Sequence, residues 1–279
     1  MIFVFKKWES FCKELAQKNM RSVCASDVAE GRAGGRYIIL KHDVETNVPR
    51  AYEMAKIEHH YGHRGSYYVQ AYLMNDGKNI LLLQDMQKMG HEISYHYDVM
   101  DACRGNLDNA IQTYEENAAL FEQKGFHLRT VCQHGNPVIE RIGYTSNRDF
   151  FRSDKVQALF PQVSDVMVDF ARKARTRFLY FSDAGRRFQL IHDPMNNDII
   201  NSDDKNILFQ DLNALSRYLD GAEESAIIST HPHRWMRSPV SYMARNMAFR
   251  TARLAAKLLL HVPGAKKIMS RYYYLAKKL

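Results

Sequence analysis

Tyr37 to Glu45 read YIILKHDVE, an apolar run followed at once by two acids that lie two positions apart. A short apolar run bounded by polar residues predicts a buried strand at Tyr37–Leu40. Because residues two apart leave an extended chain on the same side, Asp43 and Glu45 are expected to share one face. The stretch therefore predicts a core strand with a pair of carboxylates at its end.

The rest of the chain alternates short apolar runs with longer helical patterns. Further strands are predicted at 66–70, 91–95, 128–132, 166–170, 178–181, 188–191 and 226–229, and helices at 49–61, 80–89, 106–123 and 205–219. Repeated strand–helix units favour an α/β fold with a parallel sheet, either a barrel or an open sheet. A glycine-rich nucleotide loop after the first strand would favour the open sheet, and the sequence contains none.

Length and charge predict one domain with a basic tail. The chain has 279 residues, 46% of them hydrophobic, which is enough for one substantial core. The net charge is +8, yet nine basic residues and no acid follow Ser241, so residues 1–240 carry about −1. We expect residues 1–240 to form the domain, including an N-terminal helix, and residues 241–279 to form a helical tail.

The N-terminus and the cysteines indicate a reducing compartment. The opening MIFVFKKWES is charged after five residues, and no apolar run is long enough for a signal peptide or a membrane span. The four cysteines are widely spaced without a Cys-x-x-Cys pair, which argues against a zinc knuckle or a disulfide framework. We therefore expect a cytoplasmic protein.

Polar residues that could carry chemistry follow the predicted strands. They are His42, Asp43 and Glu45 after the first strand, His96 and His134 after two later ones, and Asp183 and His231 after the last ones. In a barrel the carboxyl ends of the strands meet at one rim, so these side chains can converge. Each also has an ordinary interpretation, because an Asp after a strand often accepts loop N–H groups and a His at a strand end is often a satisfied polar group.

Two carboxylates and two imidazoles can form a divalent metal site with an open position. Such a cation would lower the pKa of a water molecule towards about 7, and the second carboxylate would take the proton. His231 could then protonate a leaving amine. Asp43, Glu45, His96, His134 and His231 thus suffice for hydrolysis of an amide.

Four stretches resemble, in order, the motifs of the polysaccharide deacetylase superfamily (NodB-homology, carbohydrate esterase 4-like). They are LKHDVE at 40–45, GHEISYHY at 90–97, YFSDAGRR at 180–187 and STHPHRW at 229–235. More narrowly, they resemble the branch with an R-H-D-V-D opening, found among surface-polysaccharide biosynthesis proteins of the WbmS type. The resemblance covers most of the chain, from about Tyr37 to Trp235.

The resemblance implies a distorted (β/α) barrel that holds a divalent metal, usually zinc, with Mn²⁺, Fe²⁺, Ni²⁺ or Co²⁺ as alternatives. It implies removal of an N-acyl group, such as acetyl, from a nucleotide- or polyprenyl-linked amino sugar in the assembly of O-antigen, capsule or lipopolysaccharide. Two alternatives stay open: a sugar deformylase with the same apparatus, and an inactive barrel that binds a glycan or a partner.

By resemblance, one acid of the first motif is the general base and the other is a metal ligand. Because Val44 separates acids that are adjacent in the family, both assignments stay open, and we favour Asp43 as the base and Glu45 as the ligand. His96 matches the first metal-binding histidine of the second motif. The matching second position is Met100, a poor ligand for such a cation. His134 is the candidate replacement, with orientation of the carboxylates as the alternative role.

The later motifs imply the remaining roles. His231 matches the general acid, and Trp235 is expected to form an apolar wall for a sugar ring. Asp183 is expected to hold His231 or to bind a sugar hydroxyl. Arg186 or Arg187 is expected to pair with a substrate phosphate or carboxylate, the alternative being a solvated surface charge. His91 faces the other way from His96 and is expected to be structural.

The tail has the pattern of a basic amphipathic helix from Met243 to Leu260. Such a helix can lie on an anionic leaflet or pack on the body with its basic face in water. Our hypothesis is peripheral contact with the inner face of the membrane. Nucleic-acid binding is not expected, because the body is near neutral and carries no recognised binding motif.

Overall fold

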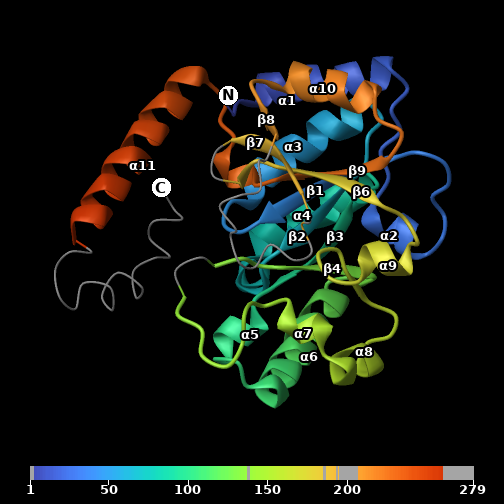
Figure 1. The fold of residues 1–279 in the computed structure, drawn as a ribbon, viewed down its shortest axis with the longest axis vertical. Helices are drawn as coiled ribbons and strands as arrows, with labels where there is room; N and C mark the ends of the chain where they lie inside the picture. The colour runs from blue at the N-terminus through green and yellow to red at the C-terminus, as the bar shows by residue number, and fades with distance from the viewer. Residues whose placement is uncertain (1–2, 137–138, 185–186, 193, 195–206, 260–279) are drawn as a thin grey trace.

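The computed structural model describes residues 3–136, 139–184, 187–192, 194 and 207–259, with the backbone alone for 249, 250 and 252–259. The strands are β1 (Ile38–Val44), β2 (Gly65–Val69), β3 (Glu92–Tyr97), β4 (Thr130–Gln133), β5 (Ser164–Asp165), β6 (Phe178–Ser182), β7 (Phe188–Ile191), β8 (Ile207–Phe209) and β9 (Ser225–Thr230). They form one sheet in the order β5-β4-β3-β2-β1-β9-β6-β7-β8 (Figure 1).

All pairings from β5 across to β6 are parallel, whereas β6–β7 and β7–β8 are antiparallel. The predicted α/β fold with a mostly parallel sheet is confirmed. Within the described part of the chain, β5 and β8 are the two edges of the sheet, so these pairings do not establish a closed barrel.

Helices connect and flank the strands. They are α1 (Phe5–Gln17), α2 (Ala25–Ala29), α3 (Val48–His60), α4 (Gly77–Lys88), α5 (Val99–Ala102), α6 (Leu107–Gln123), α7 (Asp149–Arg152), α8 (Asp154–Leu159), α9 (Phe170–Lys173), α10 (Leu212–Asp220) and α11 (Pro239–Leu259), with 3₁₀ turns at Ala71–Asn75 and Pro232–Arg234. Asn47, Asn106 and Asp211 cap α3, α6 and α10 by accepting backbone N–H groups of the first turn. Figure 1 shows α1, α3 and α10 over one end of the sheet and α5 to α8 over the other.

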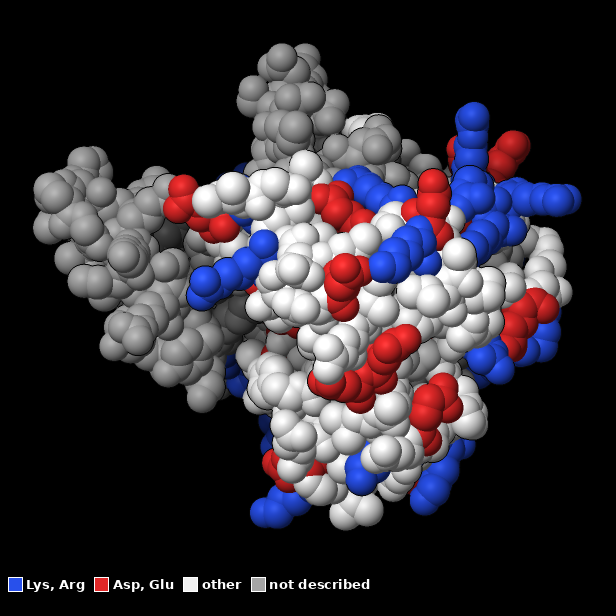
Figure 2. All heavy atoms as spheres, turned by 90° about the horizontal axis from the view of Figure 1, so that it is seen from below, with Lys and Arg blue, Asp and Glu red and all other residues white. Residues whose placement is uncertain are grey.

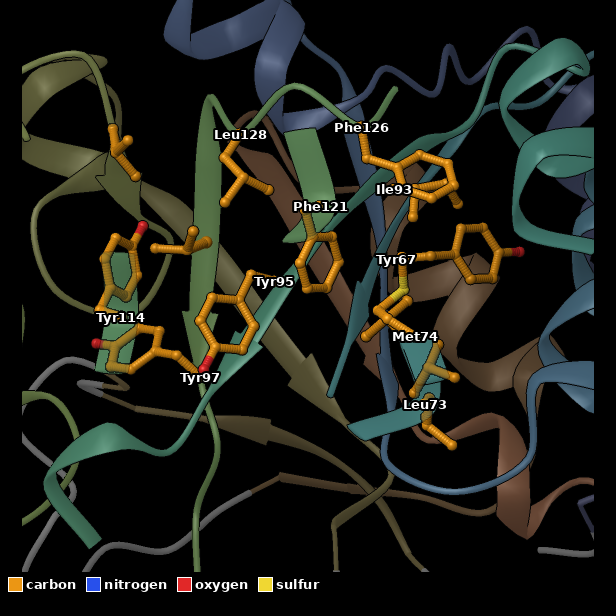
Figure 3. Packing of buried hydrophobic residues seen from close by; sticks show 14 of the residues in the cluster. Tyr67, Leu73, Met74, Ile93, Tyr95, Tyr97, Tyr114, Phe121, Phe126 and Leu128 are labelled. Atoms are coloured by element: carbon orange, nitrogen blue, oxygen red, sulfur yellow. The ribbon is translucent and has the colours of Figure 1, made fainter. Parts of the chain in front are cut away.

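Three apolar clusters hold these layers together. One packs β2 and β3 against α4 and α6, and includes Tyr67, Tyr95 and Phe121 (Figure 3). A second packs β1 and β9 against α1 and α10. The third lies on the opposite, inner face of the sheet and joins side chains of β1, β2, β4, β6 and β9: Ile39, Tyr68, Cys132, Tyr180 and Ile227. Because strands far apart in the sheet share this cluster, the sheet curves around it.

Two predicted elements are wrong. Residues 166–170 form a turn leading into α9 instead of a strand, because the Asp165 carboxylate accepts the N–H of Met167 and the Asp169 carboxylate accepts that of Asp165. The helix expected at 205–219 begins only at Leu212, since Ile207–Phe209 pairs with β7 as β8 and Asp211 caps the helix that follows. Residues 205 and 206 lie outside the described part.

A buried polar network fixes β1 against α3. Glu58 of α3 is fully buried; its carboxylate lies 2.9 Å from His42 Nε2 and accepts bonds from Trp8 Nε1 at 3.0 Å and the Tyr67 hydroxyl at 2.7 Å. Burial alone would raise the pKa of Glu58, but His42 and the other donors outweigh it and lower the pKa. The network anchors the face of β1 opposite to Asp43.

We predict that Glu58→Ala lowers the free energy of unfolding by about 3–5 kcal/mol, because it leaves the buried donors of Trp8 and Tyr67 without their acceptor. Glu53→Ala, a carboxylate near the surface of the same helix, should change it by less than about 0.5 kcal/mol. Urea denaturation followed by circular dichroism measures both. Equal losses in the two variants would contradict the anchoring role of Glu58.

Candidate metal centre

Alternation along β1 sorts its polar residues between two faces. Lys41, Asp43 and Glu45 lie on the inner face, and all three are buried. His42 lies on the outer face in the Glu58 network and so takes no part in the site. The carboxylate pair expected from the sequence is therefore directed to the concave side of the sheet.

Glu45, His96 and His134 form a compact group of donors. One ligand atom of each lies within 4.8 Å of the others, and all three residues are buried. His134 Nε2 is 3.3 Å from Glu45 Oε1. One carboxylate and two imidazoles make a donor set typical of catalytic Zn²⁺ sites, which leave a further position open.

His96 is prepared to act as a ligand. Its Nδ1 lies 3.0 Å from the carbonyl oxygen of Cys132, a bond that requires the proton on Nδ1 and leaves the Nε2 lone pair for a metal. Burial lowers the pKa of His96 to about 3, so the ring is neutral. A neutral imidazole with a fixed tautomer is what metal binding needs.

A second donor group shares His96 but contains a competing cation. Asp43, His96 and Cys132 also have ligand atoms within 4.8 Å of one another. However, Lys41 Nζ lies 2.5 and 2.7 Å from the two oxygens of Asp43 and donates to Ser229 Oγ at 3.2 Å. An ammonium at this position repels a metal ion from Asp43, so the Glu45 group is the better metal site.

Lys41 and Asp43 keep each other charged. Burial would raise the pKa of Asp43, yet the charge and the hydrogen bonds of Lys41 lower it. Burial would lower the pKa of Lys41, and Asp43 instead holds it well above its usual value. Asp43 is thus an ionised carboxylate beside the candidate metal site, in a position to accept a proton.

His231 follows β9 and is held by Asp183. Its Nδ1 is 2.5 Å from Asp183 Oδ1, and its backbone N–H donates to Oδ2 at 3.0 Å. His231 Nε2 lies 3.8 Å from Asp43 Oδ2 and 4.0 Å from Glu45 Oε1. The structure therefore brings together all five residues expected to act on the amide bond.

Asp183 has its oxygens engaged within the protein. Besides His231, Arg234 donates to Oδ1 at 3.1 Å and Trp235 Nε1 donates to Oδ2 at 3.3 Å. Although burial opposes ionisation, His231 and Arg234 lower the pKa of Asp183 to about 2. Of its two expected roles, this geometry favours holding His231 over binding a sugar hydroxyl.

The expectation for Trp235 needs correction. Its side chain is 0% exposed and packs against Phe3 and Trp8, with ring centroids 5.1 and 5.2 Å away. A ring buried in the core offers no face to a sugar. Trp235 instead donates a hydrogen bond to Asp183. Arg187 is exposed, whereas Arg186 lies outside the described residues.

Met100 is a core residue of α5 and is 4% exposed. The third donor of the candidate metal site comes from another segment, as His134 directly after β4. His91, expected to be structural, directly precedes β3 and contacts the backbone: its Nδ1 accepts the N–H of Gly65 and its Nε2 contacts the carbonyl of Ala55, both at 3.0 Å.

Sequence reasoning missed two residues of the site. Lys41 has the same two-residue spacing from Asp43 that Asp43 has from Glu45, and this was the signal that could have placed it on the inner face. His233 lies beside His231 with ring centroids 5.9 Å apart, and burial lowers its pKa to about 3. No signal in the sequence distinguishes His233 from the other histidines.

Comparisons of the chain with protein-family models, curated proteins and solved structures return no match. The deacetylase resemblance therefore rests on the order of its sequence motifs.

We predict that the protein, purified without chelators, contains about one equivalent of a divalent ion. His134→Gln should weaken zinc binding by more than about 100-fold, since even the outer partners of metal ligands contribute 10- to 100-fold. His127→Gln, which changes an exposed histidine, is the control. Mass spectrometry of metals and competition with a chromogenic chelator measure content and affinity; less than about a tenth of an equivalent in the wild type would contradict the site.

Proposed function

We propose that this chain is a metal-dependent hydrolase that removes an N-acyl group from an amino sugar. The observation that carries the proposal is the arrangement of Glu45, His96 and His134 beside an ionised Asp43 and an aspartate-held His231. The curved, mostly parallel sheet is compatible with the distorted barrel of the deacetylase superfamily, and the group lies at the carboxyl ends of its strands.

Glu45, His96 and His134 would hold the ion, which supplies Lewis acidity to the acyl carbonyl and to the attacking water. Asp43 accepts the proton of that water, and Lys41 keeps Asp43 ionised and oriented for this step. Because Asp183 accepts the Nδ1 proton, His231 presents Nε2 towards the reacting atoms and delivers a proton to the leaving amine.

The substrate class follows from the motif resemblance together with this chemistry. The donor set serves any small acyl amide, so acetyl and formyl groups are both within its reach. We propose a nucleotide- or polyprenyl-linked amino sugar of cell-surface polysaccharide assembly as the substrate. Assays of released amine across a panel of such sugars, with acetate and formate measured separately, identify the sugar and the acyl group.

We predict that Asp43→Asn lowers kcat by about 10²- to 10⁴-fold, the usual contribution of a general base, with zinc content unchanged. The substitution leaves Lys41 without its charged partner, so the double variant Lys41→Met/Asp43→Asn, which buries no charge, provides a second test. Asp108→Asn, an exposed aspartate, is the control. Near-normal turnover in both variants would exclude Asp43 as the base.

We further propose that the tail contacts an anionic membrane surface. Tyr242 is buried against Phe3 and docks the start of α11, whereas Val240, Met243 and Met247 are exposed at helical spacing. On the face of the molecule that Figure 2 shows, acidic and basic side chains are interspersed. The basic residues that follow Ser241 are Arg245, Arg250, Arg253, Lys257, Lys266, Lys267, Arg271, Lys277 and Lys278.

Within the described residues, no helix is long and apolar enough to cross a bilayer. The proposal is a basic amphipathic helix lying on the membrane surface. The boundary expected between residues 240 and 241 falls near the start of α11, and residues 260–279 lie outside the described part.

We predict that the full chain floats with vesicles containing phosphatidylglycerol at low salt and not with pure phosphatidylcholine. Reversing Arg250, Arg253 and Lys257 to Glu should weaken binding by more than about 100-fold, since each basic residue near the surface contributes about 1 kcal/mol and each glutamate is repelled by the anionic lipid. Reversing Lys13, Lys78 and Lys88 on the body is the matched control. Equal flotation of the two triple variants would overturn the proposal.

A further inference from the structure

His134 lies in an irregular segment after β4, and hydrogen bonds hold its backbone in place. Its backbone N–H donates to the carbonyl of Tyr97 at 2.7 Å, at the end of β3. Its own carbonyl accepts from Asn147 Nδ2 at 2.8 Å. Asn147 is fully buried, so the position of His134 depends on a side chain that lies 13 residues further along the chain.

Asn147 is in turn fixed by Asp101. The Asp101 backbone N–H donates to Asn147 Oδ1 at 2.9 Å, and Asn147 Nδ2 donates to Asp101 Oδ2 at 2.8 Å. Both polar atoms of the Asn147 side chain are therefore engaged with Asp101, and the amide can hold the His134 carbonyl in only one orientation.

The same carboxylate holds a second point of the segment. Arg141 binds Asp101 through Nε and Nη2, both at 2.8 Å, and its Nη2 also donates to the carbonyl of Asn136 at 2.9 Å. The Tyr144 hydroxyl adds a bond to Asp101 at 3.0 Å. The side chains of Asp101 and Arg141 are 4% and 18% exposed, so this bidentate pair is well shielded from water.

We propose that Asp101 is the positioning residue that holds His134 in the metal centre, and this inference rests on the proposed metal-dependent function. Through Asn147 and Arg141, one buried carboxylate fixes the backbone at His134 and two residues beyond it. Asp101 directly follows Met100, the position that carries a metal-binding histidine in the deacetylase motif. In this chain α5 contributes an anchor for the replacement ligand instead of a ligand of its own.

The test compares Asp101→Asn with Asp108→Asn, an exposed aspartate paired with Lys155. We expect Asp101→Asn to weaken zinc binding by about 10- to 100-fold and to change the visible spectrum of the Co²⁺-loaded protein, with Asp108→Asn like the wild type. In a His134→Gln background the effect of Asp101→Asn on zinc affinity should largely disappear, because Asp101 acts through His134. Additive losses would overturn the proposal by showing a general effect on the fold.

Two further measurements distinguish a failure of the Asp101 proposal from a failure of the proposed metal-dependent function. Arg141→Lys keeps the charge but loses the bidentate geometry, so it should reproduce a smaller zinc defect if Asp101→Asn does not fold. Hydrogen exchange of the 134–147 segment in metal-free protein should accelerate in Asp101→Asn. If the variant exchanges faster but the wild-type protein binds no metal, the proposed function and the role of Asp101 in metal binding are both overturned. Asp101 would then only stabilise the segment. Normal zinc affinity and normal exchange in Asp101→Asn would overturn the positioning role of Asp101 and leave the proposed function untouched.

Discussion

The site depends on an ion pair buried in the central strand. Lys41 and Asp43 lie two residues apart on the inner face of β1, and together they place a full positive and a full negative charge where water has little access. Such a pair is costly to desolvate and is a poor device for stability alone, because apolar residues of the same size often serve better. Its consequence is chemical: the ammonium of Lys41 disfavours a metal ion at Asp43 and leaves Glu45 as the carboxylate that could bind one.

The other strands place imidazoles beside these two carboxylates. β3 and the segment after β4 supply imidazoles on the Glu45 side, and β9 supplies His231 on the Asp43 side. Each imidazole has a partner that fixes its role: the carbonyl of Cys132 for His96, the Asp101 network for His134 and Asp183 for His231. The three imidazoles of the candidate site are thus oriented by partners that come from other parts of the chain.

The parts of the fold set by local pattern could be predicted from the sequence. Tyr37–Leu40 and 178–181 have uninterrupted apolar runs, and both are strands. Val166, Met167 and Val168 are also apolar, yet Asp165 and Asp169 on either side of them bind the local backbone and make a turn, an outcome that hydrophobic periodicity does not predict.

The site divides in the same way. Asp43, Glu45 and the histidines at strand ends could be found because parallel strands bring their carboxyl ends together. The burial of Trp235 could not, since it depends on Phe3 and Trp8, residues more than 220 positions earlier in the chain. Asp101 could not be singled out either, because its partners at Arg141 and Asn147 are side-chain contacts across 40 residues or more, with no spacing rule to predict them.

The central claim is that one divalent ion is held by Glu45, His96 and His134 while Asp43 stays with Lys41. Anomalous diffraction at the zinc edge from crystals of the zinc-loaded protein tests it most directly. We expect a single peak about 2.0–2.2 Å from one atom of each of the three ligands, with Asp43 uncoordinated. A peak bound to Asp43 and Cys132, or no peak on the inner face of the sheet, would contradict it.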